Sequence, residues 1–448
     1  MTDRLAALTE ALLAAATKAG ASAADAIAIR GTAVGIDVRS GVLEQAERSE
    51  GVEIGLRVLI GQRQASVSAS DISTRTIFEM AERAVAMAHE APEDASIGLA
   101  DPDQLASTWD LAALELEDPA PEPAAATLED DARRAEASAL AVKGVSQCQS
   151  ASASFARRHI HIAATNGFTG GYGRTSRSVS AVAITGEGVS MERDWAAEAR
   201  TFQSDLPSPD DVGDLAGRRA TERAGARKPK TGAYPVLFDE RIASGLIGHL
   251  LAALNGASIV RGGSWLRDAL GEQVLPSALS IHEDPHRARI SGSRPFDAEG
   301  LATAPRMVVE NGVLMGWTLD LGTARRLGMA STGSASRGTS SPPSPSLSNI
   351  ALTQGAKSRE ELLADMGTGL LITSMIGSSI NPTTGDYSRG ASGFWIENGQ
   401  LTYPVNECTI AGNLREMLMR ITPANDARAH LSHVVPSLLV EGLTLAGD

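Results

Sequence analysis

The sequence has 448 residues, of which 43% are hydrophobic and 21% charged, a composition typical of a globular protein and not of a disordered or fibrous one. Its net charge of −14 should repel phosphate backbones, which excludes nucleic acid as the main partner. No run of about 18 uncharged apolar residues occurs, so we expect no membrane span and a cytoplasmic location.

The first half of the chain predicts helices and antiparallel strands. Apolar residues at helical spacing indicate helices, and apolar residues that alternate with polar ones indicate strands with one buried face. Three prolines in an acidic stretch predict a linker near 117–125 that divides this half into two sub-segments. The predicted elements are a helix over 5–16, a strand over 34–38, a hairpin over 52–69 around Gly61, a helix over 77–88, a helix near 127–142 and a strand meander over 145–200.

A basic run with Gly and Pro at 223–230 marks the predicted boundary between an N-terminal domain, 1–230, and a C-terminal domain, 231–448. Asn311-Gly312 and Asn398-Gly399 each stand between alternating apolar residues, which is the strongest short signal for a β-hairpin. Helices are expected near 240–254 and 357–367, and the Ser-, Pro- and Gly-rich stretch 331–349 predicts a long loop. The fold class is α+β: a helix and antiparallel-sheet domain, then a β-rich domain with antiparallel sheets and flanking helices.

One short motif suggests zinc chemistry. His282, Glu283 and His286 match the HExxH pattern, in which two His one helical turn apart bind zinc beside a general-base Glu. Pro285 would break such a helix, and the preceding residues 278–281 look like a strand. We therefore interpret the segment as a strand that runs into a turn, and keep zinc binding as an alternative.

Other polar candidates have structural explanations that we favour. His159 and His161 share one face of a predicted strand, which is more often solvated than metal-binding, and His249 stands alone on an apolar helix. Cys408 and His433 lack a visible third partner for nucleophilic catalysis.

The loop Gly385–Gly390 places charge and hydroxyls just before the second Asn-Gly hairpin. Asp386, Tyr387, Ser388 and Arg389 could line a cavity that binds a peptide, or a subunit interface, or could form an ordinary connecting turn.

A series of short motifs, taken together, resembles the TldD/PmbA metalloprotease family, and most closely its PmbA (TldE) branch. The motifs run in family order over nearly the whole chain. They are Gly55–Gly61 (GLRVLIG), Gly245–Leu250 (GLIGHL), Pro295–Gly300 (PFDAEG), Val309–Val313 (VENGV), Gly367–Leu370 (GTGL), Gly385–Gly390 (GDYSRG), Gly393–Gly399 (GFWIENG), Tyr403–Val405 (YPV) and Ile410–Asn413 (IAGN).

The resemblance implies a cytosolic complex of two related subunits around an internal cavity, which cuts unfolded peptides and processes leader peptides. In the TldD-type subunit an HExxxH helix and a Cys near the C-terminus hold zinc. Here, if His249 matches the second His, the first falls on Ser244 and the Glu on Gly245. No Cys follows Asp426.

We therefore expect a subunit of a zinc metallopeptidase that supplies cavity wall and peptide binding but has no catalytic residue and no cofactor of its own. Zinc is expected in its partner, a TldD-type catalytic subunit, and an unfolded peptide is the expected substrate. Loop 331–349 and the 385–390 turn are expected to face the cavity. Two alternatives are an autonomous zinc peptidase that uses His282, Glu283 and His286, and a homodimeric binding or regulatory module without enzymatic activity.

Overall fold

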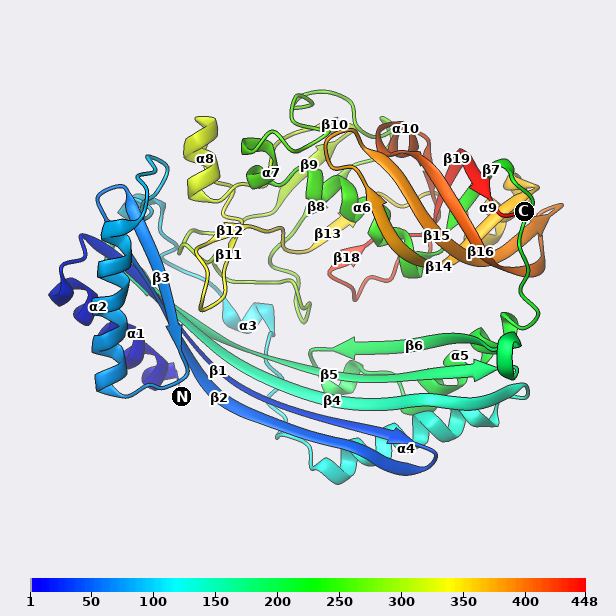
Figure 1. Cartoon of the computed structure of the whole chain (residues 1–448), viewed down its shortest axis with the longest axis horizontal. Coiled ribbons are helices and arrows are strands. Elements are labelled where there is room, and N and C mark those ends of the chain that lie inside the picture. Colours follow the sequence, from blue (N-terminus) through cyan, green and yellow to red (C-terminus); the bar gives the residue numbers. More distant parts are fainter. Residues whose placement is uncertain (1) are drawn as a thin grey trace.

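The period-two patterns of the first half form one antiparallel sheet in the computed structural model, which describes residues 2–448 (Figure 1). Its strands are β1 (Ala23–Arg39), β2 (Val42–Ile60), β3 (Arg63–Ala69), β4 (Val145–Ala164), β5 (Thr169–Thr185) and β6 (Glu192–Arg200). Its helices are α1 (Thr2–Ala19), α2 (Thr74–Glu90), α3 (Leu111–Leu114), α4 (Ala125–Ala141) and α5 (Pro209–Glu222). The predicted helices, the hairpin and the meander are confirmed.

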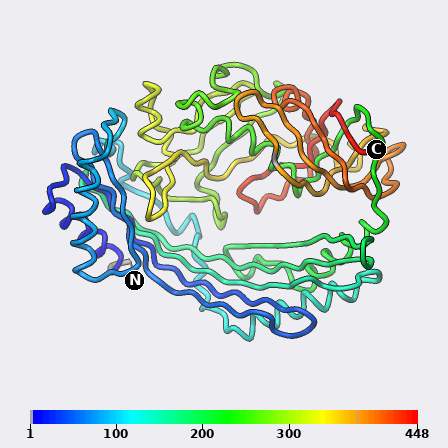
Figure 2. Tube along the Cα trace, in the orientation of Figure 1, coloured from blue at the N-terminus to red at the C-terminus, as the bar shows by residue number. Residues whose placement is uncertain are grey.

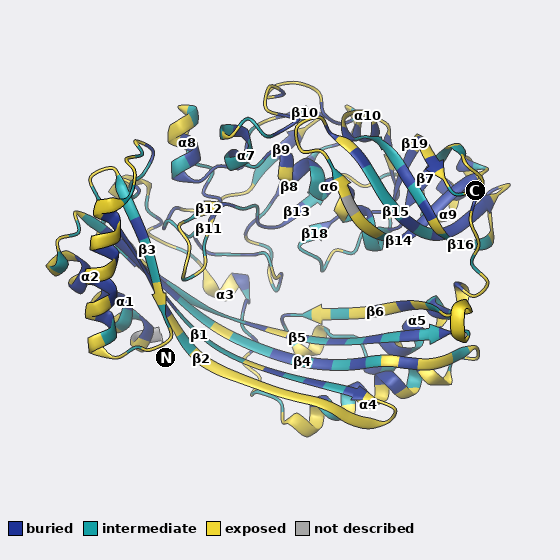
Figure 3. Cartoon of the chain, in the orientation of Figure 1, coloured by how far each residue is buried: buried dark blue, intermediate teal, exposed yellow. Residues whose placement is uncertain are grey.

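The strands follow the order β3-β2-β1-β4-β5-β6, so β1 pairs with a strand from beyond the linker. This pairing runs from Asp25 opposite Ala164 to Val38 opposite Ala151. The linker near 117–125 therefore connects two parts of a single sheet. Figure 3 shows the first half of β2 as an exposed stretch, because β3 covers only its second half, from Ile54 to Ile60.

All four long helices of this part cover the same face of the sheet. Even-numbered residues of β1 pack against these helices. Near one end of the strand, residues such as Ala26 contact α1 and α2, and near the other end, residues such as Ile36 contact α4 and α5. Odd-numbered residues of β1, such as Asp25 and Ile27, point to the opposite face. This second face curves around and faces the C-terminal part of the chain (Figure 1).

The C-terminal part is built on two larger sheets and a two-stranded ladder. Its strands are β7 (Gly232–Phe238), β8 (Ile281–Glu283), β9 (Arg306–Glu310), β10 (Val313–Leu314), β11 (Ala335–Ser336), β12 (Ser344–Pro345), β13 (Ile350–Leu352), β14 (Gly369–Ile380), β15 (Asp386–Glu397), β16 (Gln400–Asn413), β17 (Ile421–Pro423), β18 (His433–Val434) and β19 (Leu438–Ala446). Its helices are α6 (Glu240–Ala253), α7 (Gly256–Val260), α8 (Leu321–Leu327), α9 (Arg359–Met366) and α10 (Leu414–Met419). The predicted helices near 240–254 and 357–367 are α6 and α9.

One sheet follows the order β16-β15-β14-β7-β19-β17, and an additional pairing of β16 with β19 closes five of these strands into a ring. The other follows the order β10-β9-β8-β13-β18. Both predicted Asn-Gly hairpins are present, since φ is positive at Asn311, Gly312, Asn398 and Gly399, as a two-residue turn of this kind requires. Two pairs, β7 with β14 and β13 with β18, are parallel, and the others are antiparallel, so the α+β class is confirmed.

A buried ion-pair triad joins the two parts of the chain. Arg337, from the Ser-rich loop 331–349, binds the carboxylate of Asp25 on β1, and Arg57 on β2 donates to the same carboxylate from Nε at 2.7 Å. The Arg337 side chain is fully buried. The loop also lies directly on β2, because a Cβ built at Gly55 would stand 2.1 Å from the carbonyl oxygen of Thr339. Loop 331–349 is thus a clamp between the domains.

An aromatic cluster forms the second contact between the domains. Phe296 of the C-terminal part lies 4.9 Å from Trp109, 5.0 Å from Phe168 and 5.6 Å from Tyr172, measured between ring centroids, in edge-to-face geometry. Gly300 allows this packing, since a Cβ there would stand 2.5 Å from the Phe168 ring. The tube in Figure 2 shows that the two parts approach each other at the end near the N-terminal helices and separate toward the opposite end.

Among residues 2–448, no helix combines the length and the apolar character needed to cross a bilayer.

The triad predicts a large effect of Asp25→Asn on stability. The substitution leaves Arg57 and Arg337 buried without an anion, which should lower the free energy of unfolding by about 3–5 kcal/mol. Denaturant unfolding followed by tryptophan fluorescence measures this loss. The matched control is Asp268→Asn, because the Asp268 side chain is 85% exposed and its substitution should change stability by less than about 0.5 kcal/mol. Equal effects of both substitutions would contradict the role of the triad.

Stability should also depend on the charge of Asp25. Burial alone would raise the pKa of this carboxyl, but the Arg337 and Arg57 guanidiniums outweigh burial and hold the pKa below 3.8. Because the folded-state pKa is the lower one, the contribution is present at neutral pH and is lost as the pH falls below 3.8. Acid unfolding of the wild type should therefore be steeper than that of Asp25→Asn, and parallel curves would speak against this linkage.

Candidate functional site

A long cleft separates the domains beyond the clamp. It consists of two neighbouring cavities of about 650 and 720 Å³ that share one lining residue, Trp195 of β6. The walls are β5 and β6 on one side and, on the other, the C-terminal segments 288–291 and 428–432 together with Ser374, Ile376 and Ser392. Their combined volume exceeds that of a typical small-molecule pocket and suits an extended chain.

Strand β6 presents both a side-chain row and a backbone edge in this region. Ala196 points into the domain, and Asp194 reaches Arg241 of the C-terminal part at 3.3 Å. Trp195, which is 50% exposed, and Ala197 face the cleft. β6 is the last strand of its sheet, so its second edge has no strand neighbour among residues 2–448. At Trp195, the N–H donates to Asp194 Oδ1 at 2.8 Å and the carbonyl accepts from Arg219 at 3.1 Å. An edge of this kind can hydrogen-bond an added strand through its backbone groups.

The charged groups of the cleft neutralise one another. Glu198 forms ion pairs with Arg200 at 2.7 Å and Arg428 at 3.2 Å, and its carboxylate lies 3.5 Å from His430 Nε2. Burial, followed by the nearby Arg200, lowers the pKa of His430. The β5 wall adds hydroxyl groups from Ser176, Ser178 and Ser180. The surface is polar but carries little unpaired charge, which suits contact with peptide chains of varied sequence.

Helix α6 does not fit a zinc ion. His249 is the only His on this helix, and the other two positions of the expected motif are Ser244 and Gly245. The Nε2 atom of His249 is buried without a hydrogen-bond partner, and its ring packs edge-on against Tyr387 at 5.8 Å between centroids. Burial, with a contribution from Arg389, lowers the pKa of His249. One imidazole without neighbouring acidic or thiol groups cannot form a tetrahedral site.

The HExxH segment is a strand followed by a turn, which confirms the prediction made from Pro285. Glu283 is buried, and its carboxylate accepts from Arg306 Nε at 2.7 Å and from the backbone N–H of Ser348 at 2.7 Å. His286 Nε2 lies 2.9 Å from Thr303 Oγ1. His282 and Glu283 are consecutive on β8 and so point to opposite faces. Within residues 2–448, no group of three or more His, Cys, Asp or Glu is placed to hold a metal.

The four residues from 386 to 389 do not act as one polar group. Tyr387 is buried, burial raises its pKa to about 12, and its hydroxyl lies 3.6 Å from the sulfur of Met375. Asp386 is exposed and bonds to Thr384 at 2.7 Å and Asn413 at 3.1 Å, whereas Arg389 Nε donates to the carbonyl of Gly377 at 2.7 Å. These four residues, including Ser388, lie outside the linings of the two cleft cavities.

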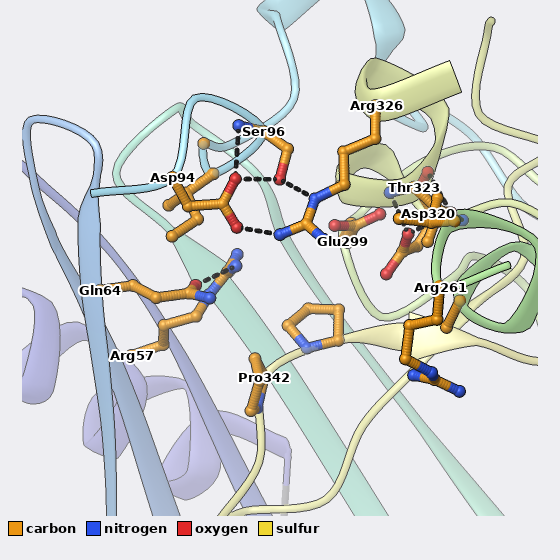
Figure 4. Close-up of a pocket in the computed structure, with 16 residues that line it drawn as sticks. Arg57, Gln64, Asp94, Ser96, Arg261, Glu299, Asp320, Thr323, Arg326 and Pro342 are labelled. Carbon is orange, nitrogen blue, oxygen red and sulfur yellow. Dashed lines mark hydrogen bonds and ion pairs between the residues drawn. The ribbon is translucent and has the colours of Figure 1, made fainter. Parts of the chain in front are cut away.

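Loop 331–349 reaches a different cavity from the cleft. Pro342 and Pro343 line an interdomain pocket of about 240 Å³ together with Arg57 and Glu299 (Figure 4). The cleft residues Trp195, Glu198 and His430 were not singled out from the sequence. The one signal for them is Trp195, a large aromatic residue among alanines on a strand whose alternate residues are buried.

Models of the three domains of the PmbA/TldA metallopeptidases match this chain. The domain 1 model matches residues 24–88, the central domain model matches 117–227, and the C-terminal domain model matches 231–447.

The sequence is also similar to curated proteins over nearly its whole length. It is 35% identical to the metalloprotease PmbA of Escherichia coli O157:H7, over 93% of this chain and 90% of that protein. It is 36% identical to the metalloprotease PmbA homolog of Haemophilus influenzae, over 97% of this chain and 94% of that protein.

Solved structures share the fold. A crystal structure from Bacteroides thetaiotaomicron superposes with a TM-score of 0.90 at 26% identity and covers 99% of this chain and 98% of that one. TldE from Thermococcus kodakarensis superposes with a TM-score of 0.85 at 19% identity, over 98% of this chain and all of that one, which is a likeness of fold alone. The resemblance seen in the sequence is thus confirmed, and this chain belongs to the PmbA/TldD metallopeptidase family.

Proposed function

We propose that this chain is the zinc-free subunit of a cytoplasmic peptidase complex, in which it pairs with a TldD-type catalytic subunit and holds an unfolded peptide. The observation that carries the proposal is the edge of β6 beside the cleft, which has no strand neighbour among the described residues. At Trp195 a peptide would replace the contacts with Asp194 and Arg219. An extended peptide that adds to this edge would gain backbone hydrogen bonds that do not depend on its sequence, while its side chains would alternate toward and away from Trp195.

The residues of α6 do not form a zinc site, which supports a catalytic role for the partner and a peptide-binding role for this chain. Peptide hydrolysis by this class of enzyme needs a metal to lower the pKa of the attacking water. Ser244, Gly245 and His249 offer one imidazole for that purpose. In this proposal the metal and its general base belong to the partner, and this chain contributes the wall that orients the peptide.

The second candidate function is an autonomous zinc peptidase, because residues 282–286 match the HExxH pattern. Against it, Glu283 is engaged by Arg306 and Ser348 and would have to leave both to act as a general base. The homodimeric binding module would need the same cleft without a catalytic partner. The predictions below distinguish these functions.

The purified chain should bind essentially no zinc. After dialysis against trace zinc, elemental analysis should find far less than one metal ion per chain, because no described residues gather a ligand set. Glu283→Gln should leave that content unchanged. Near one zinc per chain, lost on substitution of His282 or His286, would instead establish the autonomous zinc peptidase.

Trp195→Ala should weaken binding of an unstructured peptide at least tenfold, since a half-exposed indole on the cleft wall provides apolar contact area to a bound chain. Fluorescence anisotropy of a labelled unstructured peptide, with this chain in complex with a TldD-type subunit, measures the affinity. Met87→Ala is the matched control, because Met87 is 47% exposed on α2, a helix that covers the opposite face of the sheet. Equal affinities of the two variants would reject the cleft as the binding site.

A further inference from the structure

The interdomain pocket of Figure 4 is separate from the cleft and is lined by charges of both signs. Arg57 and Gln64 come from the N-terminal sheet, whereas Arg261, Glu299 and Asp320 come from the C-terminal part and lie on the other side of the cavity (Figure 4). Its volume of about 240 Å³ is far above the roughly 10–15 Å³ needed to hold one water molecule. A ligand of the size of an α-amino acid or a dipeptide would fill it.

Several of the lining charges already have protein partners. Arg326 binds Asp94 and donates from Nε to Ser96 Oγ at 3.0 Å. Arg57 is held by Asp25, in the triad described above, and donates to Gln64 Oε1 at 3.2 Å. Arg326 and Asp94 cancel each other's charge, whereas the triad of Arg57, Arg337 and Asp25 keeps one excess positive charge, which interacts with Glu299 and Asp320.

Three groups form no ion pair among the residues that the structure describes. Glu299 accepts only the backbone N–H of Leu321, at 2.8 Å, and Asp320 accepts from Thr323, at 2.8 Å from its N–H. Neither carboxylate forms an ion pair with a Lys or Arg of the described chain, and the exposed guanidinium of Arg261 has no acceptor there. The pocket thus has two carboxyl groups and one guanidinium that form no ion pair within the described chain.

The pocket is also unfavourable for the anion at Glu299. Burial, then the nearby Asp297 and Asp320, raise the pKa of Glu299 to about 8, while the charge of Arg57 acts in the opposite direction. A bound ammonium group would add a positive charge directly beside this carboxyl and would favour ionised Glu299.

We propose that this pocket binds a small zwitterion, an α-amino acid or a dipeptide, with its ammonium group at Glu299 and Asp320 and its carboxylate at Arg261. The apolar parts of Ile97, Val260 and Pro342 would contact the aliphatic portion of the ligand. Because both domains line the pocket, the ligand would strengthen the domain interface. This inference does not rest on the proposed function of the cleft.

Isothermal titration calorimetry of the full chain with glycylglycine tests the proposal. We expect saturable binding that weakens at least tenfold with N-acetylglycylglycine, which lacks the ammonium group, and with glycylglycinamide, which lacks the carboxylate. Glu299→Gln and Arg261→Gln should each weaken glycylglycine binding to a similar extent. Glu310→Gln, at an exposed position on β9, is the matched control and should bind like the wild type.

Proton release provides a readout that a structural defect would not imitate. Since the pKa of Glu299 is about 8, this group is largely protonated at pH 7, and ligand binding should release protons. Titration in two buffers of different ionisation enthalpy measures that release, which Glu299→Gln should abolish. Absence of saturable binding, equal binding of the blocked dipeptides, or unchanged proton release in Glu299→Gln would each overturn the proposal.

Discussion

The buried carboxylate of Asp25 is the constraint on which the arrangement of the two domains depends. It lies on the sheet face that carries no helices, and two guanidiniums from distant parts of the chain share it. Removing such a charge from water costs more than a single pair returns, so the site is stable only when both arginines are in place. Arg337 can reach Asp25 only if loop 331–349 lies across β2, and this requirement fixes the C-terminal part over one end of the sheet.

The cleft is a consequence of that placement. The sheet is long and curved, and the clamp and the Phe296 cluster hold the C-terminal part against the end near the N-terminal helices (Figure 1). Toward the other end, the domains are joined by separate polar contacts, such as those from Arg223 to Ser392 at 3.0 Å and from Arg241 to Asp194 at 3.3 Å, with cavities between them. The surface left between them carries hydroxyls, neutralised charges and a half-exposed tryptophan. Such a surface offers contacts that many peptide sequences can use, without the deep apolar pockets that select one ligand.

Much of the secondary structure could be predicted from the sequence, because it depends on local patterns. Alternating residues in β2 and β3 around Gly61 and the Asn-Gly pairs at 311 and 398 specify hairpins through the geometry of a few consecutive residues. Pairings between distant segments had no comparable signal. Neither the contact of β1 with β4 nor the closure of the ring by β16 and β19 follows from residues near the strands themselves.

The site residues show the same limit more sharply. The spacing of Glu283 from His282 and His286 suggests a general base, but its carboxylate forms an ion pair with Arg306 from another strand. The sequence suggests that Tyr387 is a polar loop residue, but its ring lies in the hydrophobic core and packs against His249. Arg337, within a stretch that composition marks as a loop, is among the most buried charges of the protein. In each case the role depends on a partner remote in sequence, so residue type and spacing alone could not identify it.

The most direct test of the account is a peptidase assay on this chain alone and after mixing with a TldD-type subunit of the same family. The account predicts no cleavage of an unstructured peptide by either chain alone and cleavage by the mixture. Cleavage should persist with His249→Ala in this chain and disappear when the zinc ligands of the partner are substituted. Cleavage by this chain alone that is lost on substitution of His282 or His286 would contradict the account.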